Sequence, residues 1–168
     1  MNQSRVREAS AVDDAVVLEL MTEYMTEALA RFEQSYGFAM GRDAEHTTDA
    51  LAKFRRPSGV IGLAELDGSP AGVAALRVQA DGAAEIKRMF VRPEHRGAHL
   101  GSEMLDWLLE LCRDDLGSST VRLDSSRFMR EAHRLYESRG FVERTPYEGS
   151  EIPADLQHLW RFYELRLG

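Results

Sequence analysis

Cysteine is nearly absent from this chain, since Cys112 is the only one among its 168 residues. A single cysteine excludes an internal disulfide framework and a cysteine-rich metal site, and it agrees with a reducing compartment. Cys112 lies in an apolar run over residues 108–112, and this context favours a buried helical thiol over a catalytic nucleophile. The histidines form no HExxH motif either, and we therefore expect no metal cofactor.

Long apolar segments are absent as well. The chain has no run of about 18 consecutive apolar residues, which is the length that a membrane-spanning helix requires. Residues 1–12 are polar and lack the apolar segment and cleavage site of a secretory signal. We therefore expect a cytoplasmic protein with no membrane partner.

Positive charge is in the minority, with 21 lysine and arginine residues against 28 aspartate and glutamate residues and a net charge of −7. A nucleic-acid partner is not expected, because neutralising phosphates requires clustered lysine and arginine. An acidic surface instead favours cationic small molecules or basic peptide ends. Hydrophobic residues make up 43% of the chain, which suffices for one core, so we expect a single domain over residues 1–168.

The spacing of the apolar residues predicts a mixed α/β fold. Residues 60–66 and 71–78 flank an Asp-Gly-Ser-Pro turn, and residues 85–91 form a further strand, so we expect an antiparallel meander. Other strands are predicted at residues 5–9, 120–124, 141–143 and 160–167, and helices at residues 13–33, 47–54, 100–116 and 131–138. Consecutive strands argue against the regular strand–helix alternation of a Rossmann or flavodoxin-like nucleotide-binding domain.

The junction between the strand that ends at Pro93 and the helix that begins near Leu100 carries the strongest chemical signal. Such a junction directs unpaired backbone N–H groups and the positive end of a helix dipole at one spot, which suits a pyrophosphate. Arg96 can add a charge-assisted hydrogen bond, and Gly97 and Gly101 allow a phosphate to approach the backbone closely. The spacing alone also fits glycines that only shape a tight turn. It matches neither GxGxxG nor a P-loop.

Two segments at this junction and beyond it resemble the hallmarks of one family. Residues 90–101 resemble the acetyl-CoA motif [RQ]-x-x-G-x-[GA] of the GNAT N-acetyltransferases, and residues 132–141 resemble the motif A-x-x-[LF]-Y-x-x-x-G-F of the same family. The resemblance covers residues 85–141. It implies a mainly antiparallel central sheet flanked by helices, with splayed parallel strands at the acyl-CoA site. It also implies acetyl-CoA as cosubstrate. His99 departs from the pattern, since the family usually has glycine there.

The resemblance also implies roles for individual residues. Tyr136 matches the tyrosine that protonates the coenzyme A sulfur, although its spacing alone also fits a core aromatic residue. Glu85 is placed like the glutamate that takes the amine proton, or it is simply solvated. The hydroxyl of Ser125 bonds the pantetheine or caps the following loop. The implied cofactor-contacting residues are Met89, Phe90, Val91, Arg96, Gly97, Ala98, His99, Leu100, Gly101, Ser102, Ser125 and Ala132.

The acceptor implied by the resemblance is a primary amine of a small molecule or peptide. We expect it between the first two helices and the loop over residues 144–153, next to Tyr24, Phe32, Tyr36 and Tyr147. Acidic residues there can attract an ammonium group or remain solvated surface charges, namely Glu27, Glu33 and Glu148. A non-catalytic acyl-CoA-binding regulatory module is the alternative function. We expect a monomer or a homodimer.

Overall fold

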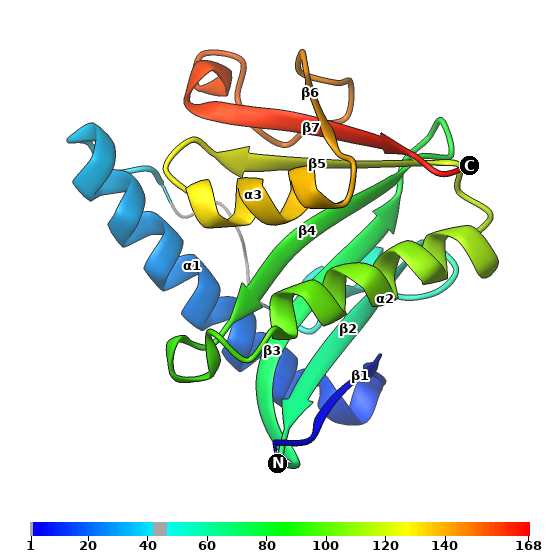
Figure 1. Cartoon of the computed structure of the whole chain (residues 1–168). Coiled ribbons are helices and arrows are strands. Elements are labelled where there is room, and N and C mark those ends of the chain that lie inside the picture. The colour runs from blue at the N-terminus through cyan, green and yellow to red at the C-terminus, as the bar shows by residue number, and fades with distance from the viewer. Residues whose placement is uncertain (1, 42–46) are drawn as a thin grey trace.

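The computed structural model describes residues 2–41 and 47–168. Its centre is a seven-stranded sheet with strand order β1-β2-β3-β4-β5-β7-β6 (Figure 1). The strands are β1 (Ser4–Glu8), β2 (Gly59–Leu66), β3 (Ser69–Val78), β4 (Ala84–Val91), β5 (Thr120–Ser126), β6 (Val142–Arg144) and β7 (Trp160–Arg166). Every neighbouring pair is antiparallel except β4 and β5, which are parallel. The predicted mixed, mainly antiparallel sheet is thus confirmed.

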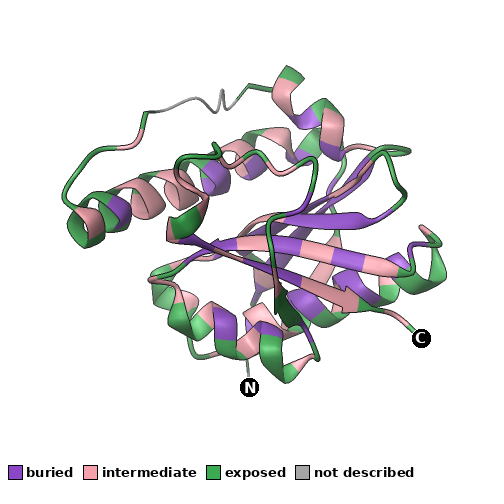
Figure 2. Ribbon diagram, turned by 90° about the horizontal axis from the view of Figure 1, so that it is seen from above, coloured by how far each residue is buried: buried purple, intermediate pink, exposed green. Residues whose placement is uncertain are grey.

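Helices cover both faces of this sheet. The α-helices are α1 (Asp14–Tyr36), α2 (Leu100–Asp114) and α3 (Arg130–Ser138), and the 3-10 helices are η1 (Ala11–Asp13), η2 (Asp49–Phe54), η3 (Pro93–His95) and η4 (Gln157–Leu159). One core cluster joins α1 and η2 to one face, with Leu20 and Phe54 fully covered. A second cluster joins α2 and α3 to the opposite face, with Leu105 and Tyr136 inside it. Figure 2 shows the buried residues along the sheet and on the inward sides of the helices.

Cys112 lies in this second cluster and has no exposed surface. Burial raises the pKa of its thiol to about 12. Because the reactive form of cysteine is the thiolate, this side chain is an inert part of the core, as the apolar context indicates.

The hairpin of β2 and β3 is tighter than the sequence pattern predicts. The expected turn spans four residues, but Leu66 pairs directly with Ser69. The two residues between them both have left-handed conformations, with φ values of 50° at Asp67 and 80° at Gly68. Two such residues close a hairpin whose twist matches its strands, so Ser69 and Pro70 belong to β3. Similarly, residues 49–54 form a 3-10 helix where an ordinary helix is predicted.

The first helix is longer than its apolar stripe predicts. It runs to Tyr36, where Gly37 adopts φ 78° and donates its N–H to the carbonyl of Glu33 over 2.8 Å. A left-handed glycine is a common helix end. In residues 2–41 and 47–168, no helix is both long and apolar enough to cross a membrane.

Candidate active site

The parallel strands β4 and β5 pair over only a short distance and then diverge, as Figure 1 shows. Their recorded pairs are Ala84 with Val121, Glu85 with Arg122 and Ile86 with Leu123. Beyond these pairs β4 continues to Val91 beside β3, while β5 continues to Ser126 beside β7. We call the gap between residues 87–91 and residues 124–126 the fork. Its β4 side presents a backbone edge that can pair with an extended ligand.

A bulge in β4 shapes the entrance of the fork. Lys87 pairs with Ala75 of β3, but the next recorded pair is Phe90 with Val73, so β4 contains one extra residue. Arg88 lies within this step and has a left-handed backbone with φ 54°. Bulges bend a strand and redirect its side chains, and they occur frequently beside active sites. The bend turns the end of β4 away from β5.

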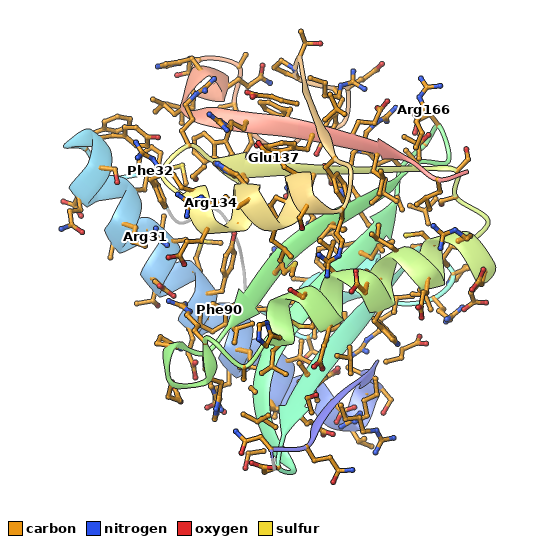
Figure 3. The ribbon with its side chains drawn as sticks, in the orientation of Figure 1. Arg31, Phe32, Phe90, Arg134, Glu137 and Arg166 are labelled. Atoms are coloured by element: carbon orange, nitrogen blue, oxygen red, sulfur yellow. The ribbon has the colours of Figure 1, made fainter. Side chains whose placement is uncertain are left out.

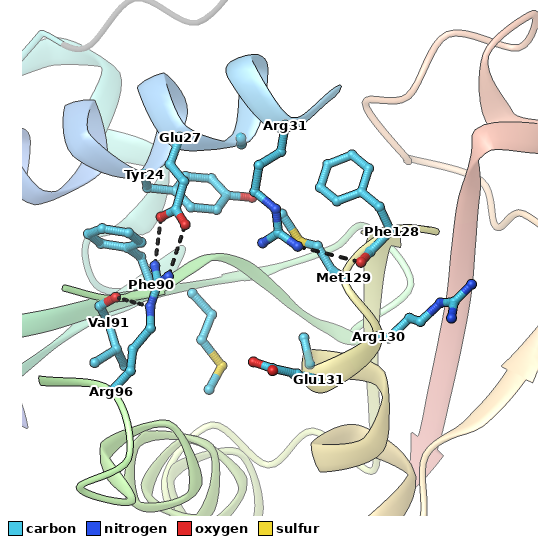
Figure 4. Close-up of a pocket in the computed structure, with 13 residues that line it drawn as sticks. Tyr24, Glu27, Arg31, Phe90, Val91, Arg96, Phe128, Met129, Arg130 and Glu131 are labelled. Atoms are coloured by element: carbon cyan, nitrogen blue, oxygen red, sulfur yellow. Dashed lines mark hydrogen bonds and ion pairs between the residues drawn. The ribbon is translucent and has the colours of Figure 1, made fainter. Parts of the chain in front are cut away.

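Two cavities occupy the fork, and we distinguish them by size. The larger cavity has a volume of about 510 Å³ and is lined by α1, the end of β4 and the start of α3 (Figure 4). The smaller cavity has a volume of about 200 Å³ and extends toward Tyr136, Asp124 and Glu151. The two are contiguous because they share five lining residues, which are Tyr24, Ala28, Met89, Met129 and Ala132.

The turn that leads into α2 has the backbone geometry of an anion site. Gly97 adopts φ 91° and His99 adopts φ 63°, and α2 begins at the next residue. The first N–H groups of a helix have no partner inside the helix, so they are available to an anion. The side chain of His99 is exposed, whereas that of Leu100 is buried in the core, so Leu100 can contact a ligand only through its backbone. Ala98, Gly101 and Ser102 are partly exposed.

Arg96 does not extend freely toward this turn. Its guanidinium donates two hydrogen bonds to Glu27, over 2.9 and 2.6 Å, and one to the carbonyl of Val91 over 3.0 Å (Figure 4). The hydrogen bonds to Arg96 lower the pKa of Glu27, and the same hydrogen bonds raise the pKa of Arg96. The pair joins α1 to the turn, and any ligand anion must share this guanidinium with Glu27.

Further cations line the larger cavity beside Arg96. Arg31 of α1 lies over the ring of Phe128 at 5.0 Å and donates to the Phe128 carbonyl over 3.5 Å. Figure 3 shows Arg31 and Phe32 on α1 beside the loop that precedes α3. Arg130 lies on the same rim at the start of α3. The larger cavity is therefore lined by three arginines, of which Arg96 directly precedes the turn that leads into α2, and such a group of cations suits phosphate groups.

Tyr136 lies at the wall of the smaller cavity, only 8% exposed. Burial raises its pKa well above the ordinary value, so its hydroxyl keeps its proton at neutral pH. Ser125 lies at the same wall, and its hydroxyl is 3.1 Å from Nε2 of His133, which burial keeps neutral by lowering its pKa. The hydroxyl of Ser125 also donates to Met129 Sδ over 3.8 Å, so its partners are the side chains of His133 and Met129.

Glu85 lies behind the smaller cavity, with no exposed surface. Its carboxylate accepts hydrogen bonds from Arg77 Nε and from the Tyr147 hydroxyl, both over 2.7 Å. It lines neither cavity. The Tyr147 hydroxyl is also 3.5 Å from Asp124, which does line the smaller cavity, so Glu85 reaches the cavity only through other residues.

The smaller cavity brings together polar residues that the sequence reasoning missed. Lys87 and Asp124 form an ion pair of 3.0 Å at the base of the fork, and Glu151 lies 3.8 Å from the same ammonium group. Arg88 lines the same cavity. The available signal was a pair of adjacent cations, Lys87 and Arg88, inside an otherwise buried apolar strand, because such charges are expensive to bury without a purpose.

The predicted acceptor residues are only partly brought together. Tyr24 and Phe32 line the smaller cavity, whereas Tyr36 and Tyr147 line neither cavity. Tyr147 is instead the buried donor to Glu85. Among the predicted acidic residues, Glu27 is paired with Arg96, and Glu33 and Glu148 are exposed and line neither cavity. Over the described residues, no group of three histidine, cysteine, aspartate or glutamate side chains is arranged to hold a metal ion.

Comparisons with known proteins agree on one family. Residues 18–141 match the family model described as the acetyltransferase (GNAT) family. An uncharacterized N-acetyltransferase of Schizosaccharomyces pombe is 33% identical over 122 residues, which are 69% of this chain and 74% of that protein. An IAA acetyltransferase of Azospirillum brasilense is 28% identical over 139 residues, covering 82% of this chain and 84% of that protein.

Solved structures extend the likeness over the whole fold. A GNAT family acetyltransferase of Staphylococcus aureus superposes with a TM-score of 0.76 at 18% identity, over 99% of this chain and 100% of that chain. A protein of Salmonella typhimurium, solved with its cofactor acetyl-CoA, superposes with a TM-score of 0.69 at 20% identity, over 98% of this chain and 94% of that chain. At these identities the structures support the fold alone.

Proposed function

Because the chain belongs to the GNAT family of acetyltransferases and is an acetyl-CoA-dependent N-acetyltransferase, we propose that the fork is its active site and that a small primary amine is its acceptor. The observation that carries this proposal is that the cavity walled by Tyr136 is contiguous with the cavity lined by Arg96, which directly precedes the turn that leads into α2. The pyrophosphate belongs on the turn backbone over residues 97–102. The pantetheine belongs along residues 89–91, where the β4 edge offers strand-like pairing.

Transfer forms a C–N bond to the amine as the C–S bond of the thioester breaks. The protonated hydroxyl of Tyr136 supplies a proton to the departing sulfur. The amine proton leaves toward Asp124, which lies on the smaller cavity, and Tyr147 connects this carboxylate to Glu85. In this proposal Glu85 is a positioning residue that holds Tyr147. No covalent enzyme intermediate is required.

The first test concerns the turn. We expect Gly97→Glu to weaken acetyl-CoA binding at least about 100-fold in calorimetric titration, because it places a negative charge and a side chain where phosphate binds. The matched control is Gly82→Glu, since Gly82 also has a left-handed backbone, with φ 87°, and open space around its Cβ position. Equal acetyl-CoA binding by the wild type and both variants would show that the pyrophosphate does not bind at this turn.

The second test concerns Tyr136. With acetyl-CoA and a panel of amines, we expect Tyr136→Phe to lower amine-dependent thiol release by about 100-fold or more while acetyl-CoA affinity changes little. Tyr36→Phe is the control, because it also removes a tyrosine hydroxyl but lines neither cavity. A Tyr136→Phe variant that is fully active would show that the sulfur is protonated from elsewhere.

A further inference from the structure

Among residues 2–41 and 47–168, Arg88 differs from Lys87 and Arg77 near the smaller cavity because no salt bridge joins it to a carboxylate. Over residues 2–41 and 47–168, the hydrogen bond recorded for its guanidinium is one to Met21 Sδ, over 3.6 Å. The guanidinium also lies over the ring of Phe54 at 5.2 Å. Thioether sulfur is a weak acceptor, so most of the five guanidinium donors of Arg88 are left for another partner.

The neighbouring charges are paired among themselves. Lys87 pairs with Asp124 over 3.0 Å, Arg77 with Glu85 over 2.7 Å, and Lys53 with Glu151 over 2.9 Å. Each carboxylate at this end of the fork thus already has a cation within 3.0 Å. Within the described part of the chain, Arg88 is without such an ion pair and is influenced only through space by Glu151, although the protein as a whole carries a net charge of −7.

An uncompensated cation in a half-buried position is unfavourable. Burial lowers the pKa of Arg88, whereas the ion pairs of Arg77 and Arg96 raise the pKa of those two arginines. The backbone at Arg88 is also strained, with φ 54° within the bulge of β4. Strained residues and unpaired charges gather where they contact a ligand. Both features of Arg88 therefore point to a ligand group that is absent from the free protein.

The cofactor phosphates are not the expected anionic partner of Arg88. Arg88 lines only the smaller cavity, together with Tyr136 and Asp124. The arginines at positions 31, 96 and 130 line the larger cavity, and Arg96 directly precedes the turn that leads into α2. A guanidinium binds a carboxylate with two parallel hydrogen bonds, so a carboxylate on the acceptor itself matches the charge and geometry of Arg88.

We propose that the acceptor is a small amino acid whose carboxylate is bound by Arg88 while its amine faces the thioester beside Asp124. This inference rests on the proposed function of the fork. One side of the smaller cavity is apolar, with walls from Met25, Leu29, Phe32, Met40, Ile152 and Trp160. An apolar or aromatic side chain fits these walls. A volume of about 200 Å³ suits a single amino acid better than a peptide.

The experiment compares acceptors that differ only in the carboxylate. Steady-state acetylation by the wild-type protein is measured for L-phenylalanine, L-phenylalaninamide and 2-phenylethylamine, and for 6-aminohexanoate with its amide as a longer pair. We expect kcat/KM for at least one carboxylate to exceed that of its amide by about 100-fold, since a buried cation left unpaired disfavours the neutral analogue. Arg88→Met should reduce this ratio to near one, and Arg88→Lys should restore part of it.

Arg88→Met keeps an unbranched side chain against Phe54, and Arg113→Met is the control on an exposed arginine of α2. Amides that react as well as the acids, or an Arg88→Met variant that lowers both equally, would overturn the inference while leaving the N-acetyltransferase intact. Binding of the acids to the CoA-loaded protein in calorimetry, abolished in Arg88→Met but without any acetylated product, would instead contradict the proposed function and keep the carboxylate site.

Discussion

The two ends of the fork are built in different ways. At the proposed cofactor end, the candidate anion-binding groups are backbone N–H groups of one continuous stretch, residues 97–102, and the nearby Arg96 is held by Glu27. At the acceptor end, the polar groups are side chains from separate parts of the chain: Lys87 and Arg88 on β4, Asp124 and Ser125 on β5, and Glu151 in the loop before η4. The first end depends on local conformation and the second on tertiary packing.

From this difference we expect the acceptor end to tolerate fewer substitutions than the cofactor end. A turn that binds a pyrophosphate through its backbone keeps its function with many side chains, provided that the left-handed positions remain. An acceptor site made of side chains from distant segments changes with any one of them. The following predictions contrast the two ends, beginning with the largest effect.

Removing a carboxylate at the acceptor end should lower the free energy of unfolding far more than removing one at the cofactor end. We expect Glu85→Ala to lower the free energy of unfolding by about 3 kcal/mol, because Glu85 is fully buried and Arg77 and Tyr147 lose their partner. We expect Glu27→Ala to lower it by at most about 1 kcal/mol, because the pair with Arg96 is partly exposed. Urea denaturation measures both variants, and similar losses would show that the two ends do not differ in this way.

Two glycines of the cofactor end should respond in opposite directions to alanine. Gly97→Ala should destabilise the fold by about 1–2 kcal/mol, because Gly97 has φ 91° and the cost is conformational. Gly101→Ala should stabilise it by about 0.5–1 kcal/mol, because the new Cβ lies 3.6 Å from Leu135 Cδ2, an ordinary contact, inside a helix. Thermal or urea unfolding of the two variants checks the sign. Destabilisation by Gly101→Ala would indicate that this glycine is required by the fold and not only by a ligand.

The smallest effect concerns pH. The pKa of Glu27 is lowered in the folded protein by its hydrogen bonds to Arg96, so its contribution to stability is present above its ordinary pKa of 4.5 and is lost as pH falls through the folded value. We expect wild type to exceed Glu27→Gln by a few tenths of a kcal/mol at pH 7, since the pair is partly exposed, and to lose this advantage in strong acid. A difference that grows toward low pH would contradict this sign.

The sequence alone predicted most of the fold, including the strand–turn–helix junction at which the cofactor is proposed to bind. Strand and helix periodicity located the meander and α2, because each signal lies within one element. The predicted hairpin turn was two residues too long. Asp67 and Gly68 alone form the turn, but Ser69 and Pro70 are also common turn residues, so the Asp-Gly-Ser-Pro pattern does not show where the turn ends. The α1 boundary at Tyr36 was missed because Gly37 ends the helix beyond its apolar stripe.

The acceptor end could not be predicted in the same way. Glu85 was expected to contact the acceptor amine. Whether its carboxylate faces a ligand or is buried behind the cavity depends on its hydrogen-bond partners. These partners, Arg77 and Tyr147, are 8 and 62 residues away in the sequence. The pairing of Lys87 with Asp124 spans 37 residues. No periodic pattern in the chain encodes such contacts, and they arise only when β4, β5 and the loop before η4 are brought together.

The five residues shared by the two cavities set a limit for redesign. Tyr24, Ala28, Met89, Met129 and Ala132 face both volumes, so a substitution at any of them alters the apparent affinities for both substrates at once. Leu29, Met40 and Trp160 face the smaller volume alone. A library intended to retarget the enzyme to new amines without impairing its use of the cofactor should therefore be confined to positions of this second kind.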